Sequence, residues 1–116
     1  MKVERPRATR CLFCAPLLLT DLKTGNATSE YTKDLSLFGC NVVPGDATPL
    51  GTRTRIQIAY KGQIFQAFGQ VVYVRKGGGA GIAFTKIEPR YQLVLDEWIA
   101  ELRNRNAESP FRENRT

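Results

Sequence analysis

The sequence predicts a mainly all-β domain, in which about six short antiparallel strands are followed by a single C-terminal α-helix. The first observation is an alternation of apolar and polar side chains over residues 52–60, which is typical of a half-buried strand. The second is a change to three- and four-residue spacing after Pro89, which is typical of an amphipathic helix. At 116 residues the chain is long enough for one domain with one hydrophobic core. Such strands close into a small barrel or form a strongly twisted sheet.

The first third of the chain predicts a basic arm, an apolar strand and a polar strand. Residues 1–10 carry four Lys or Arg residues against one Glu, and we expect this arm to be flexible when nothing is bound. Residues 11–20 are strand-like, and Pro16 within them favours an edge position or a bulge. A turn signal over 23–26 leads to a polar strand over 28–34.

The middle of the chain predicts a meander of four further strands. These are expected over residues 40–43, 52–60, 63–74 and 80–85. Lys61 and Gly62 form a hairpin turn, and Gly69 is a bend in the longest strand. The glycine-rich run 76–79 has no following Lys-Ser or Lys-Thr and precedes a strand, so we interpret it as a turn and not as a phosphate-binding loop.

The C-terminal part predicts one amphipathic helix from about Pro89 to Asn104. Trp98 belongs to its apolar stripe, so we assign this residue to the core and not to a ligand platform. The expected organisation is therefore an arm over 1–10, a compact domain over 11–104, and a disordered tail over 105–116, where no periodicity is present.

The segment between the polar strand and the next strand reads D-x-S-x-x-G, with Asp34, Ser36 and Gly39 at its defined positions. In an extended segment, Asp34 and Ser36 point to one side, while Leu35 and Leu37 point to the other, into the core. Gly39 permits a positive φ or a close approach of backbone. These groups predict a short polar claw, which suits a ligand with N–H donors and phosphate oxygens.

The residue types argue against an enzyme or a metal site. The chain has no His, which removes the commonest general base and the commonest metal ligand. Cys11 and Cys14 have the spacing of a redox or zinc motif, but with only Cys40 in addition the set falls short of four zinc ligands. We therefore expect buried, reduced thiols, and no catalytic residues, metal or cofactor.

Charge and hydropathy bear on partners and location. The net charge of +6 makes polyanions plausible partners. The apolar run 17–19 is far shorter than the roughly 18 residues that a membrane span needs, and we find no signal peptide. Together with reduced thiols, this favours a cytoplasmic protein without a membrane span.

The order of these features resembles a PilZ domain over roughly residues 5–103. The specific parts are the basic arm ending in Arg10, the D-x-S-x-x-G motif, and the strand that begins Gly-Ile-Ala-Phe at Gly81. The resemblance implies a bacterial six-stranded antiparallel β-barrel with one C-terminal helix. It also implies binding of cyclic di-GMP through an R-x-x-x-R segment and a [D/N]-x-S-x-x-G segment.

The R-x-x-x-R segment is only partly present. Its second Arg falls on Arg10, but its first position falls on Pro6, with Arg5 and Arg7 on either side. The resemblance thus implies a ligand site formed by the residues Arg5, Arg7, Arg10, Asp34, Ser36 and Gly39. It also implies a stand-alone receptor, whose arm closes over the ligand and signals to a downstream protein partner.

The chemistry of cyclic di-GMP agrees with such a site. Guanine O6 and N7 are paired acceptors for an Arg fork, and guanidinium groups also pair with phosphate oxygens. The N1–H and N2–H groups of guanine are donors that Asp34 can accept.

Two alternatives remain open from the sequence. A PilZ-like domain that has lost nucleotide binding would act as a protein-interaction adaptor, and Pro6 supports this hypothesis. General nucleic-acid binding by a small basic barrel would need exposed aromatic residues among basic ones, whereas Tyr60 and Tyr73 fall on faces that we expect to be buried. We therefore expect no nucleic-acid partner.

Overall fold

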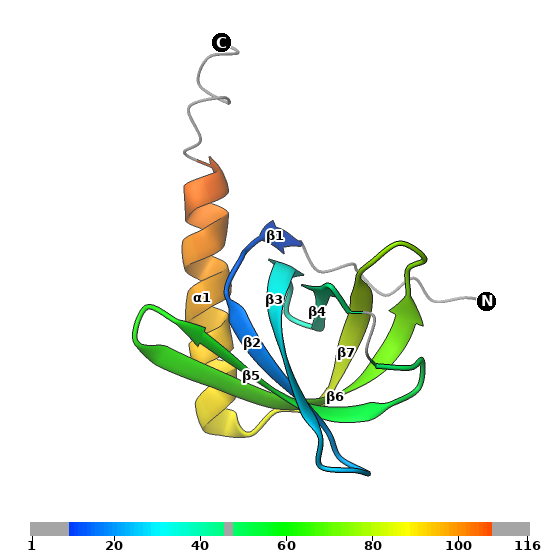
Figure 1. The fold of residues 1–116 in the computed structure, drawn as a ribbon. Coiled ribbons are helices and arrows are strands. Elements are labelled where there is room, and N and C mark those ends of the chain that lie inside the picture. Colours follow the sequence, from blue (N-terminus) through cyan, green and yellow to red (C-terminus); the bar gives the residue numbers. More distant parts are fainter. Residues whose placement is uncertain (1–9, 46–47, 108–116) are drawn as a thin grey trace, which may run out of the picture.

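The protein is a closed β-barrel with one helix packed against it (Figure 1), as seen in a computed structural model that describes residues 10–45 and 48–107. The elements in chain order are β1 (Cys11–Leu12), β2 (Pro16–Asp21), β3 (Ala27–Leu35), β4 (Gly39–Val43), β5 (Arg53–Tyr60), β6 (Gln63–Val74), β7 (Ala80–Lys86) and α1 (Pro89–Ala107).

Six antiparallel strands close the barrel, and the short β1 is an additional strand. The order around the barrel is β3-β2-β5-β6-β7-β4, and pairing of β4 with β3 completes the ring. Strand β1 pairs with β3 beyond the end of β2, through Cys11 opposite Leu35 and Leu12 opposite Asp34. The predicted fold class, a six-stranded antiparallel β-barrel with one C-terminal helix, is confirmed.

Local sequence signals account for most strand boundaries. The β5–β6 hairpin turns at Lys61 and Gly62, which have φ values of 50° and 78° and so match the primed turns that suit a twisted hairpin. The ladder between β6 and β7 shifts register between Phe68 and Gly69, which confirms the predicted bend. Residues 76–79 form the β6–β7 turn, as predicted.

The apolar run over 11–20 forms two strands and not one. Pro16 is the first residue of β2, a position where a missing N–H costs no ladder bond. Between β1 and β2, Thr32 of β3 ties down the intervening segment: its hydroxyl accepts a bond from Ala15 N at 2.8 Å and donates to Phe13 O at 2.6 Å. This break leaves β1 as a separate short strand that leads directly from Arg10.

The core lies between the inner faces of the strands and one face of α1. Trp98 is 2% exposed, as predicted for a core residue. Its ring lies edge-on to Tyr60 at 5.3 Å and 5.7 Å from Phe13, while its Nε1–H donates to Gln63 Oε1 at 3.1 Å. Figure 1 shows α1 beside the barrel, and it packs against β6 and β1. The helix continues three residues beyond the predicted end at Asn104, to Ala107.

The described part of the chain contains no helix that combines the length and the apolar composition needed for a membrane span.

Candidate functional site

The D-x-S-x-x-G segment lies at the end of β3, in the turn to β4, and begins on the outer surface of the barrel. The β3–β4 ladder shifts register between Thr32 and Asp34. Because a bulge adds one residue, Asp34 faces outward although Glu30 and Thr32, at the preceding even positions, are buried. Asp34 is thereby placed opposite Leu12 of β1 and Asn41 of β4.

Arg10 and Asp34, two residues that the sequence predicts for the site, form an ion pair. Arg10 Nη1 donates to Asp34 Oδ1 at 3.0 Å, with side-chain exposures of 52% and 15%. Strand β1 starts at the next residue, so its pairing with β3 holds Arg10 close to the carboxylate. An exposed guanidinium beside a partly covered carboxylate offers both donors and acceptors to a ligand.

Ser36 differs from the predicted claw. Strand β3 ends at Leu35, so the alternation stops, and Ser36 is 3% exposed. Its Oγ donates to Gly39 O at 3.3 Å and accepts from Phe38 N at 3.2 Å, while Ser36 N donates to Gly39 O at 2.9 Å. The hydroxyl therefore holds the turn between β3 and β4, and the prediction of a shared exposed face with Asp34 is wrong. Leu37 packs against the core, as predicted.

Position 39 requires a glycine because the backbone of β7 lies close to it. A Cβ at this position would collide with the carbonyl oxygen of Ile82 in β7 and would lie 3.2 Å from Ala83 Cα. Its φ is not in the left-handed region, so the close approach of backbone is the reason for glycine here.

Two side chains that are connected to Asp34, one directly and one through the other, were not predicted from the sequence. Asn41 Nδ2 donates to both Asp34 oxygens at 2.9 Å, and Asn41 N donates to Asp34 Oδ1 at 3.3 Å. Tyr73, from β6, is predicted on a buried face, but it is only partly buried and lies on the outer face, where its hydroxyl donates to Asn41 Oδ1. The position of Asn41 could have been inferred from a hairpin pairing of β3 with β4 across the motif. Tyr73 becomes a neighbour of Asn41 only through the pairing of β4, β7 and β6.

Cys40, beside the motif, faces the core. Burial, and then the Asp34 carboxylate, raise the pKa of the Cys40 thiol to about 12, against a lowering effect of Arg10. Cys11 is also buried, and burial raises the pKa of its thiol. Cys14 is exposed, so the prediction of buried thiols is wrong for this residue. In the described residues, no cluster of three His, Cys, Asp or Glu side chains could hold a metal ion.

The predicted site residues Arg5 and Arg7, together with Pro6, lie outside the described residues. The predicted arm over 1–10 is therefore represented by Arg10 alone, and the tail beyond Ala107 is likewise outside the described part.

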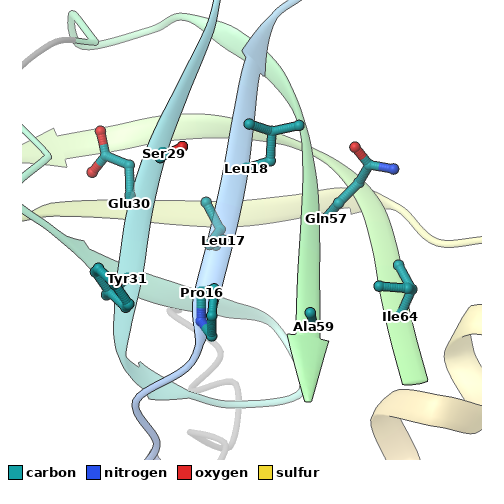
Figure 2. A pocket seen from close by; sticks show the side chains of 9 residues that line it. All are labelled: Pro16, Leu17, Leu18, Ser29, Glu30, Tyr31, Gln57, Ala59 and Ile64. Atoms are coloured by element: carbon teal, nitrogen blue, oxygen red, sulfur yellow. The ribbon is translucent and has the colours of Figure 1, made fainter. Parts of the chain in front are cut away.

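A separate hollow on the barrel has a different character. It has a volume of about 450 Å³ and is lined by side chains of β2, β3, β5 and β6, which Figure 2 shows with Tyr31, Leu18 and Ile64 among them. The lining residues are Pro16, Leu17, Leu18, Ser29, Glu30, Tyr31, Gln57, Ala59 and Ile64. No Lys or Arg is among them, so this surface offers no cation to a phosphate.

The fold and the polar cluster define a class: a small closed β-barrel with an Arg–carboxylate pair on its outer face, beside a D-x-S-x-x-G turn. The family model for the PilZ domain matches residues 4–101, which is most of the chain. The protein therefore belongs to the PilZ domain family. No curated protein matches the sequence.

Solved structures share this fold at low sequence identity. The PilZ domain of CeSA from a cellulose-synthesising bacterium is 15% identical with a TM-score of 0.69, covering 83% of this chain and 99% of that chain. The PilZ domain of YcgR from Escherichia coli, a structure with c-di-GMP, is 19% identical with a TM-score of 0.70, covering 90% and 96%.

A third structure is the inhibitor of motility MotI/DgrA from Bacillus subtilis, which is 14% identical with a TM-score of 0.72. The match covers 92% of this chain and 55% of that chain, so the present chain spans about half the length of that protein.

Proposed function

We propose that the protein is a non-enzymatic receptor for cyclic di-GMP, which binds against Asp34 and Arg10. The single observation that supports this most is the Arg10–Asp34 pair at 3.0 Å, held beside an intact D-x-S-x-x-G turn in a PilZ domain. A related fold, the YcgR PilZ domain from Escherichia coli, has been solved with c-di-GMP.

The Asp34 carboxylate is suited to the Watson–Crick edge of guanine. Oδ1 already accepts bonds from Arg10 and Asn41, whereas Oδ2 accepts only from Asn41 among the described residues. A carboxylate has about four lone-pair sites, so Oδ2 retains capacity for the N1–H or N2–H of a base. Charge-assisted bonds of this kind are stronger than neutral ones.

Arg10 has donors to spare. One of its five N–H groups is used by Asp34, and the guanidinium is half exposed. The remaining donors can pair with a phosphate oxygen or with guanine O6 and N7. In the proposed complex, Arg5 and Arg7 contribute further donors when the arm closes, and ordering of the arm is the signal passed to a protein partner.

Ser36 and Gly39 act in this proposal chiefly by shaping the turn that presents Asp34. The Ser36 hydroxyl bonds within the turn, and Gly39 lets β4 approach β7. Direct contact of either residue with the ligand stays a prediction.

Isothermal titration calorimetry with cyclic di-GMP tests the proposal, with GTP as the control ligand. Arg10→Ala and Asp34→Ala are each expected to weaken binding by about ten- to a hundredfold, since bonds to charged groups contribute about 1.5–3 kcal/mol. Arg53→Ala and Glu97→Ala remove exposed charges elsewhere and are expected to bind like the wild type. Absence of saturable heat with the wild type would contradict the receptor function.

Pro6 distinguishes the receptor from the adaptor alternative. Pro6→Arg restores the R-x-x-x-R spacing to Arg10 and is expected to tighten binding about tenfold, while Ala8→Arg adds the same charge at another spacing and is expected to have a smaller effect. If neither the wild type nor Pro6→Arg binds, the adaptor function becomes the better explanation. Partner binding should then be unaffected by Asp34→Ala.

A further inference from the structure

A continuous row of paired residues crosses the outer face of the barrel from the Arg10–Asp34 pair to β6. Asp34 of β3 is opposite Asn41 of β4, Asn41 is opposite Gly81 of β7, and Gly81 is opposite Tyr73 of β6. Side chains of directly opposed residues lie on the same face of a sheet. The row spans three inter-strand spacings, or about 14 Å.

Hydrogen bonds connect the row from end to end. The Asn41 amide donates from Nδ2 to Asp34 and accepts at Oδ1 from the Tyr73 hydroxyl, so each end of the amide has one defined partner. The absence of a side chain at Gly81 allows the bond between Tyr73 and Asn41, because a Cβ at Gly81 would overlap the ring of Tyr73, which crosses above β7 to reach Asn41. The position of the Asp34 carboxylate thus depends on two residues from other strands.

A second cation stands at the far end of the row. The guanidinium of Arg75, which follows β6, lies 5.6 Å from the centroid of the Tyr73 ring. Arg75 is exposed, and within residues 10–45 and 48–107 no carboxylate forms an ion pair with it. The polar row is therefore flanked by Arg10 at the β1 end and by Arg75 at the β6 end.

We propose that Arg75 forms the second half of the ligand site, and that Asn41 and Tyr73 position the Asp34 carboxylate of the first half. Arg75 binds the phosphate or base of the dinucleotide that lies farther from Arg10, because its free guanidinium donors can pair with phosphate oxygens or with guanine O6 and N7. Asn41 and Tyr73 are positioning residues that hold Asp34 in its acceptor orientation. This inference rests on the proposed cyclic di-GMP function.

The test compares binding of cyclic di-GMP to Tyr73→Phe and Arg75→Ala with binding to two matched controls. Tyr73→Phe removes only the hydroxyl, and loss of one hydrogen bond is expected to weaken binding about three- to tenfold. Arg75→Ala is expected to weaken binding about tenfold and to reduce the salt dependence of the affinity, since one charge contact is lost.

The controls remove the same groups elsewhere. Tyr31→Phe removes an exposed hydroxyl of β3, and Arg90→Ala removes a charge near the opposite end of β7; both are expected to bind like the wild type. Circular dichroism and thermal melting check that every variant is folded.

The outcomes separate the two proposals. If the wild type binds and both Tyr73→Phe and Arg75→Ala match their controls, the inference is overturned while the receptor function stands. If the wild type does not bind, the proposed function fails, and the inference fails with it. If Tyr73→Phe and Arg75→Ala bind cyclic di-GMP more weakly than the wild type while both control variants bind like it, the result supports the extended site.

Discussion

Gly39 lies against the backbone of β7, and this contact limits what can replace it. A Cβ would collide with Ile82 O, and neither backbone can move without disturbing the β4–β7 ladder. We predict that Gly39→Ala lowers the free energy of unfolding by about 1–3 kcal/mol without any ligand, the usual cost of overpacking. Urea denaturation measures this, with the exposed Ser29→Ala as a control that changes it by less than about 0.5 kcal/mol.

An alternative role for Gly39 predicts the opposite pattern. If Gly39→Ala were as stable as the wild type but unable to bind cyclic di-GMP, the glycine would serve the ligand and not the barrel.

The three cysteines differ in environment and therefore in reactivity. Burial raises the pKa of the Cys40 thiol to about 12 and raises that of Cys11, whereas Cys14 is exposed. Because the thiolate is the reactive form, Ellman's reagent at pH 8 is expected to modify one thiol in the folded protein and all three after denaturation. Rapid modification of all three thiols in the folded protein would contradict the buried positions of Cys11 and Cys40.

The raised pKa of Cys40 also sets a direction for stability. Burial favours the neutral Cys40 thiol in the folded state. Its contribution to the free energy of unfolding is therefore fully present below pH 9.0, the pKa of the thiol in the unfolded chain, and is lost as the pH rises from 9.0 towards about 12.

At the scale of elements, α1 contributes one side of the core and is tied to the β5–β6 hairpin. Lys61 Nζ donates to Glu101 Oε2 at 2.5 Å, and Arg105 Nη2 donates to Tyr60 Oη at 2.7 Å. The Glu101 bond raises the pKa of Lys61, and the same bond lowers the pKa of Glu101. These contacts are exposed, so the buried Trp98 is the stronger connection between helix and barrel.

Removal of the Trp98 side chain tests how strongly this residue connects α1 to the barrel. Trp98→Ala is expected to reduce the free energy of unfolding by about 3–5 kcal/mol, because the cavity would lie between Phe13, Tyr60 and Phe65. The control is Leu93→Ala, since Leu93 is 66% exposed on the same helix and is expected to have little effect. A small loss for Trp98→Ala in chemical denaturation would mean that the barrel is stable without the helix contact.

At the scale of the whole molecule, ring closure joins the residues of the proposed site. Asp34, Asn41 and Tyr73 come from three strands, and Arg10 is brought in by a fourth. A ligand bound across several strands stabilises the folded state of the whole barrel, because the unfolded chain has no such site.

This stabilisation can be measured directly. Cyclic di-GMP at 100 times its Kd is expected to contribute about 2.7 kcal/mol, which raises the melting temperature by roughly 10 °C for a chain of this size. Differential scanning fluorimetry checks the shift, with GTP at equal concentration and the Asp34→Ala variant as controls. An equal shift with GTP would show that the site does not select the cyclic dinucleotide.

Most of the strands, their turns and the helix were predictable because each depends on a short stretch of chain, whereas the division of residues 11–20 into β1 and β2 was not predicted. The alternation in β5, the Lys61–Gly62 turn and the spacing around Trp98 are local patterns that neighbouring residues decide. The motif at Asp34 was predictable for the same reason, since its defining residues lie within six positions of one another.

Other features of the site depend on the tertiary structure, because they are set by the ends of strands and by the register between strands that are distant in sequence. The bulge after Thr32 turned Asp34 outward, and the end of β3 at Leu35 placed the Ser36 hydroxyl inside the turn. The contact between Asn41 and Tyr73 joins residues 32 positions apart and exists only because β4, β7 and β6 pair in one register. Local sequence carries no record of such pairing, because a shift by one residue would turn each of these side chains to the other face.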